Sequence, residues 1–172
     1  MSRKSIIGNL LGVLWISAVL FVSSEGAEPF KEDENTLVLF HLDEGEGSIT
    51  VDSSKNQYIG KLRKTEWVEG LFGKALSFNG ENSRITVPTR LNLGGMDRLT
   101  IELYVYVRSD DNNLGGWPRL IEKRGSYELI LFGKGIRFGI SGVGFVETSS
   151  PIPLDTWVYL AATYDGNEMK IY

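Results

Sequence analysis

Acidic side chains are concentrated in one short stretch of the sequence, Leu39–Ser54 (LFHLDEGEGSITVDSS). Its carboxylates belong to Asp43, Glu44, Glu46 and Asp52, and two glycines lie among them. Carboxylates placed in this way can do three kinds of chemistry. A pair can act as acid and base in glycoside hydrolysis, several oxygens can bind Ca²⁺, and single side chains can shape turns by accepting backbone hydrogen bonds.

Composition limits the other catalytic chemistries. The chain has no cysteine and one histidine, His41, which lies in an expected strand. Zinc sites built from Cys and His ligands are therefore excluded, and no G-x-S-x-G motif accompanies the histidine to support a Ser-His-Asp triad. We expect no catalytic residue in this chain.

The candidate ligands of a structural Ca²⁺ are Asp52 and Asn79, with further oxygens from loops that converge on them. The segment DSSKNQYIGKLR is not an EF-hand loop, because Gln57 stands where the sharp-turn glycine belongs. Turn formation explains the same composition without an ion, since Asp and Ser bond their own backbone and Gly45 and Gly47 permit positive φ.

The elements that must position these residues are short strands. The segment LTIELYVYVRS alternates strictly, with Leu99, Ile101 and Leu103 on one face. Hairpin turns are predicted at 133–135 and 165–167, and the expected strands 75–78 and 84–87 are joined by a tight polar connection. The pattern predicts an all-β, two-sheet antiparallel jelly-roll sandwich. Because the chain stops inside an expected strand, we expect this sandwich to be truncated at its C-terminus.

The first residues have the features of an export signal. Arg3 and Lys4 precede the apolar stretch IIGNLLGVLWISAVLFV, and small residues follow it. We expect a signal peptide over 1–26, a polar spacer over 27–36 and the jelly-roll domain over 37–172. An uncleaved membrane anchor is the alternative. The domain is therefore expected to be secreted or held at the cell envelope or surface, with no membrane contact after signal cleavage.

The formal net charge of −4 and the absence of a basic run argue against nucleic acid as a partner. Since export permits disulfides, the lack of cysteine means that packing, or a bound ion, must stabilise the domain.

Several stretches resemble the laminin G-like branch of the concanavalin A-like lectin and glucanase superfamily. They are LVLFHLDEGEGSITVDSSKNQYIGKL, WVEGLFGKALSFNGENSRITVP, LTIELYVYVRS, WPRLIEKRGSYELIL and PLDTWVYLAATYDGNEMKIY. The resemblance implies two antiparallel sheets, a carbohydrate-binding or adhesive role within a larger extracellular protein, and in many members a structural calcium ion. The sequence departs from the family pattern at Lys55, where glycine is usual, and at Tyr104, where tryptophan is usual.

Glucanases of this superfamily place acids at alternate positions of one strand. Here Glu44 and Glu46 have that spacing but lie among glycines, and the alternate neighbours of Glu102 are Thr100 and Tyr104. We therefore expect a non-catalytic module. The alternatives are an accessory domain of a glycoside hydrolase whose catalytic part lies elsewhere, and a protein–protein adhesion or structural domain.

Alternation also predicts a ligand surface, because exposed aromatic rings stack on sugars and a few polar groups orient them. The residues expected to face away from the core and to bind a glycan or cell-surface polysaccharide are Glu102, Tyr104, Tyr106, Arg137 and Tyr159. Tyrosine is also a good strand residue without any ligand.

Overall fold

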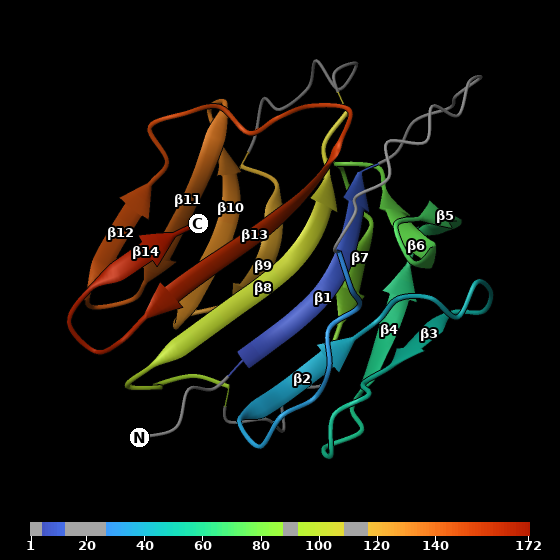
Figure 1. Cartoon of the computed structure of the whole chain (residues 1–172), viewed down its shortest axis with the longest axis horizontal. Helices are drawn as coiled ribbons and strands as arrows, with labels where there is room; N and C mark the ends of the chain where they lie inside the picture. Colours follow the sequence, from blue (N-terminus) through green and yellow to red (C-terminus); the bar gives the residue numbers. More distant parts are fainter. Residues whose placement is uncertain (1–4, 13–26, 88–92, 109–116) are drawn as a thin grey trace.

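The computed structural model describes residues 5–12, 27–87, 93–108 and 117–172. Within these ranges the chain forms fourteen strands and no helix, and so no helix there is long and apolar enough to span a membrane. The strands form three sheets, which we name after a central strand of each: the β8 sheet, the β10 sheet and the β4 sheet (Figure 1). The all-β prediction is confirmed.

The β8 sheet has the strand order β14-β13-β8-β1-β6-β5, with β2 also paired to β1. Its strands are β1 (Ser5–Gly12), β2 (Thr36–Phe40), β5 (Glu66–Gly70), β6 (Gly73–Phe78), β8 (Leu99–Tyr106), β13 (Trp157–Tyr164) and β14 (Met169–Ile171). The pairs β13–β8, β13–β14 and β5–β6 are antiparallel, whereas every pair made by β1 is parallel.

The other two sheets are smaller. The β10 sheet has the order β12-β11-β10-β9, and the β4 sheet has the order β3-β4-β7, both antiparallel throughout. Their strands are β9 (Arg119–Lys123), β10 (Tyr127–Phe132), β11 (Gly135–Ile140), β12 (Gly144–Glu147), β3 (Ile49–Val51), β4 (Ile59–Arg63) and β7 (Arg84–Thr86).

The core lies between the β8 sheet and the β10 sheet, which cross face to face in Figure 1. Along β8 buried and half-buried residues alternate, as the sequence predicts. The buried side chains of β8 pack in one cluster with those of β10 and β11, such as Leu129 and Phe138, which are fully enclosed. The opposite faces of the two sheets therefore point to opposite sides of the sandwich.

The segment expected to be a signal peptide contributes a strand to the middle of the β8 sheet. β1 pairs along most of its length with β8, from Ser5 opposite Thr100 to Leu11 opposite Tyr106, and on its other edge with β2 and β6. The predicted cleavage region up to Gly26 lies outside the described residues.

Two hairpin predictions are confirmed. β10 and β11 pair up to Phe132 and Gly135, with Gly133 at a φ of +59° between them. β13 and β14 are joined at 165–168, where the Asp165 carboxylate accepts the amide N–H groups of Asn167 and Glu168. By contrast, the polar connection after Phe78 joins no hairpin, because β6 pairs within the β8 sheet and β7 within the β4 sheet.

Candidate functional site

The acids of the Leu39–Ser54 stretch shape turns. The Glu44 carboxylate accepts the amide N–H of Val51 at 2.8 Å, and Gly45 and Gly47 adopt φ values of +77° and +88°. These φ values favour glycine, because a side chain would be strained there.

Asp52 is a buried carboxylate whose two oxygens are both occupied. It accepts the amide N–H groups of Leu39 at 2.7 Å, Ser54 at 2.8 Å and Tyr58 at 3.2 Å, and the Ser54 hydroxyl at 2.8 Å. Asp52 is 1% exposed to solvent. Asp52 thereby ties β2, through Leu39, to the turn that begins the β3–β4 connection.

Asn79 has the same kind of role. Its side-chain oxygen accepts three successive amide N–H groups, those of Glu81, Asn82 and Ser83, each at 3.1 Å. Calcium needs six to eight free oxygens, and the carboxylate of Asp52 and the amide oxygen of Asn79 are engaged by the backbone. These two residues do not fit a calcium site, and no group of three or more His, Cys, Asp or Glu with metal-binding geometry occurs in the described ranges. Calcium binding elsewhere stays a prediction.

Four of the five predicted ligand residues lie together on the outer face of the β8 sheet. Tyr104 and Tyr159 are directly opposite each other on β8 and β13, with ring centres 5.6 Å apart. The Tyr159 hydroxyl donates to the Glu102 carboxylate at 2.5 Å, and Tyr106 packs edge-on against Trp157 at 5.8 Å. We call this group the tyrosine surface.

The tyrosine surface is partly covered by two other rings of the chain. Phe30, from the segment before β2, lies 5.2 Å from Tyr104 and 6.1 Å from Tyr159, and Phe72 meets Tyr104 edge-on at 5.3 Å. Burial and the bond to Glu102 raise the pKa of the Tyr159 phenol well above its ordinary value. Tyr104, the central ring, is therefore engaged in aromatic packing on several sides.

Arg137, the fifth predicted residue, lies on the opposite side of the sandwich. It is on β11, with its side chain on the outer face of the β10 sheet, because its neighbours Ile136 and Phe138 point into the core. Its guanidinium forms an ion pair with Glu147, at 2.5 Å from Nη2 and 2.7 Å from Nε. The expectation of one shared surface is not met for this residue.

Arg137 stands among three aromatic rings. Its guanidinium carbon lies 3.4 Å from the ring centre of Phe132, 4.5 Å from that of Phe145 and 5.8 Å from that of Trp117. Stacking of this kind orients the rings. Phe145 and Trp117 remain 61% and 57% exposed. Two exposed rings therefore lie near one paired guanidinium.

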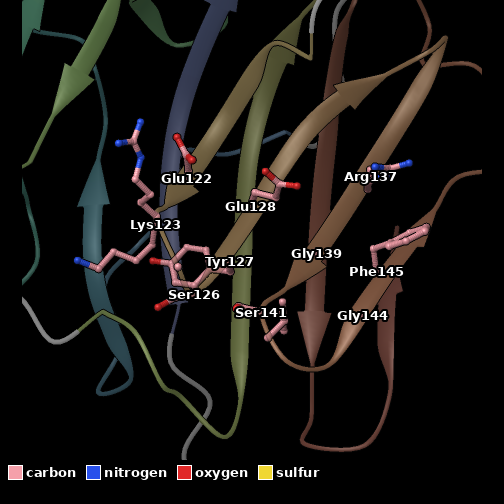
Figure 2. A pocket seen from close by; sticks show the side chains of 13 residues that line it. Glu122, Lys123, Ser126, Tyr127, Glu128, Arg137, Gly139, Ser141, Gly144 and Phe145 are labelled. Atoms are coloured by element: carbon pink, nitrogen blue, oxygen red, sulfur yellow. The ribbon is translucent and has the colours of Figure 1, made fainter.

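A hollow of about 290 Å³ opens beside Phe145 (Figure 2). Its shape follows from the register of four strands, which places Glu122, Glu128, Gly139 and Phe145 side by side across β9, β10, β11 and β12. Because Gly139 has no side chain, the row has a gap between a carboxylate and a ring. Ser126 and Ser141 line the lower end in Figure 2, joined by a backbone hydrogen bond of 2.8 Å.

The sequence patterns do not predict this hollow, because the alternation that identifies outward-facing residues says nothing about a missing side chain in a neighbouring strand. The available signal was the spacing of glycines in β11, at 135 and 139.

Comparison with known proteins gives one match. The model of the laminin G-like family within the concanavalin A-like lectin/glucanases superfamily matches residues 79–172. The resembling stretches that precede residue 79 lie outside this match. No curated protein matches the chain, and no solved structure does. Since the match covers more than half of the sequence and the fold has the expected antiparallel sheets, the chain belongs to the concanavalin A-like lectin/glucanases superfamily, as a laminin G-like member.

Proposed function

We propose that the chain is an exported, non-catalytic carbohydrate-binding or adhesion module that holds a glycan on the outer face of the β10 sheet. The family in general supports binding or adhesion. The proposed location rests on two exposed rings, Trp117 and Phe145, that both lie near the guanidinium of the Arg137–Glu147 ion pair. Large exposed rings flanked by polar groups are what sugar stacking requires.

The charges of this face also favour binding over catalysis. Glycoside hydrolysis needs two carboxyl groups that flank the scissile bond. Glu122 and Glu128 are cross-strand neighbours, so both stand on the same side of the hollow, and the opposite side is formed by Phe145. Glu122 is also held by Arg119 at 3.2 Å. A sugar placed over Gly139 would meet acids on one flank only.

The test is a glycan array with the full chain and three variants. Trp117→Ala and Phe145→Ala remove the open rings, and we expect each to weaken glycan binding about fivefold, because ring stacking contributes on the order of 1 kcal/mol. Tyr159→Ala, on the other side of the sandwich, is the matched aromatic control and should bind like the wild type.

The outcomes separate the alternatives. Binding that is lost in Tyr159→Ala and kept in Trp117→Ala would move the site to the tyrosine surface. Release of reducing sugar from a bound glycan by the wild type, but not by Glu128→Gln, would overturn the non-catalytic assignment. A folded protein that binds no glycan would leave the protein-adhesion alternative.

A further inference from the structure

One carboxylate in the lining of the hollow over Gly139, that of Glu128, has no direct charged partner among the described residues. Around it, Arg119 pairs with Glu122 at 3.2 Å and Arg137 pairs with Glu147 at 2.5 Å. Glu128 lies between these two pairs, half-buried, and its carboxylate forms no ion pair or hydrogen bond within the part of the chain that the structure describes. Glu128 is therefore an acid without a direct ion pair, in a lining that also contains the basic residues Lys123, Arg124 and Arg137.

This carboxylate lies directly beside the gap left by Gly139. A Cβ placed on Gly139 would be 3.6 Å from Glu128 Cγ and 3.8 Å from Glu128 Oε1, which is ordinary contact distance. On the other side of Gly139, in register, is the open ring of Phe145. Figure 2 shows Glu128 and Phe145 on the two sides of the gap. A group seated there touches a carboxylate and an aromatic ring together.

Lys123 and Arg124 also line the hollow, and neither forms an ion pair with Glu128 in the part of the chain that the structure describes. Lys123 pairs with Tyr127 on the core-facing side of the strand, and its Cε is 4.0 Å from the position of a Cβ on Gly94. In Figure 2 the Lys123 side chain extends away from Glu128. The guanidinium of Arg137, although close to Phe145, is already balanced by Glu147.

A carboxylate facing an aromatic ring is a favourable setting for a cation, which gains an ion pair and a cation–π contact at once. The hollow of about 290 Å³ is at the lower limit of small-molecule sites, and so it holds a single unit rather than a chain. Resting on the proposed function, we infer that the sugar unit seated over Gly139 carries a free protonated amine: the ligand is an amino-sugar glycan, with Glu128 receiving the amine.

The inference is tested by calorimetry on the full chain with three oligosaccharides of equal length. They are a β-linked glucosamine oligomer with free amines, its N-acetylated form and a β-linked glucose oligomer. We expect the amine form to bind about tenfold more tightly than the other two, because a hydrogen bond to a charged group contributes roughly 1.5 kcal/mol or more.

Two variants locate the effect. Glu128→Gln should bring the amine-to-neutral affinity ratio close to one while leaving the neutral oligomer's affinity unchanged, and Glu66→Gln, an exposed acid on β5, controls for the loss of one negative charge. Gly139→Ala should weaken all three ligands by filling the floor of the hollow, without destabilising the fold, because its new methyl meets neighbours only at 3.6 Å or more.

The possible failures are distinct. Equal affinity for the amine and neutral oligomers, or an amine preference that survives Glu128→Gln, would overturn this inference and leave glycan binding standing. Loss of all glycan binding would overturn the proposed function as well. Binding of oligolysine but of no amino sugar, with the same dependence on Glu128, would reassign the hollow to a basic peptide segment and overturn the amino-sugar assignment.

Discussion

The ring of Phe30 packs on the ring of Tyr104, with the two centres 5.2 Å apart and the ring planes inclined by 38°. Phe30 belongs to the segment predicted as a polar spacer, but this segment is attached to the domain at several points. The Glu32 carboxylate accepts the amide N–H of Lys55 at 2.6 Å, and the Lys55 ammonium donates to the Glu34 carbonyl at 3.0 Å. Lys55, one of the two departures from the family pattern, thus holds the segment in place.

Phe30→Ala should therefore lower the free energy of unfolding by about 1–2 kcal/mol, the value for a half-buried rather than a fully buried ring. Urea denaturation measures the change. The control is Phe145→Ala, which removes a ring that is 61% exposed and should alter stability by no more than about 0.5 kcal/mol. Equal effects of the two variants would show that Phe30 does not pack on the β8 sheet in solution.

Asp52→Ala should be among the most destabilising single substitutions. It removes the acceptor of four hydrogen bonds from a buried site, and each stranded donor costs about 1–3 kcal/mol. Asp52→Asn keeps one oxygen and should cost less. The stability that Asp52→Ala loses relative to the wild type should be the same in EDTA as in excess Ca²⁺. A loss seen only in calcium would mean that Asp52 does hold the ion.

A protein that starts at Ala27 lacks β1, and this exposes the strand edges with which β1 pairs. The edges of β8 and β2 then have unpaired backbone groups in the middle of the sheet, and such edges promote self-association. We expect a lower melting temperature and a larger mass by light scattering than for a protein that lacks residues 1–4 alone. If export removes 1–26, as we propose, the mature protein has these open edges.

Adding a peptide of the sequence SIIGNLLG to the shortened protein should restore the melting temperature, because it supplies the missing pairs with β8. A shortened protein that is monomeric and as stable as the full chain would show that β1 contributes nothing to the sheet.

The phenol of Tyr159 should resist deprotonation, since burial and the bond to Glu102 raise its pKa. The folded-state pKa is higher than the unfolded one of about 10, so the native protein keeps a proton that the unfolded chain has lost. Stability from this group is complete below pH 10 and falls as the pH rises above it.

Alkaline titration of phenolate absorbance, with Tyr159→Phe and Glu102→Gln, checks this expectation. Tyr159→Phe should remove one late-titrating tyrosine, and Glu102→Gln should make one tyrosine titrate earlier. Tyr127, whose pKa is also raised by burial, should be unaffected in both variants. A titration curve that neither variant alters would contradict the Tyr159–Glu102 bond.

The strands and most of their faces could be read from the sequence, because side-chain direction alternates along a strand irrespective of what surrounds it. Leu99, Ile101 and Leu103 are buried as expected, and Tyr104 and Tyr159 share an outer face as expected. Turn residues could also be read from the sequence, since Gly133 acts through its backbone conformation and Asp165 through bonds from its carboxylate to the next residues. These are local properties.

The partners of each strand were decided only by the tertiary structure. Alternation placed Arg137 on an outer face, but not on which sheet, and strand pairing puts it across the sandwich from Tyr104. The hollow over Gly139 arises from the register between four consecutive strands, β9 to β12, which sets Glu128, Gly139 and Phe145 side by side. The sequence by itself determined the strands, their apolar faces and the turns, because these depend on neighbouring residues. The binding surface depends on the register between neighbouring strands, which single-strand patterns do not encode.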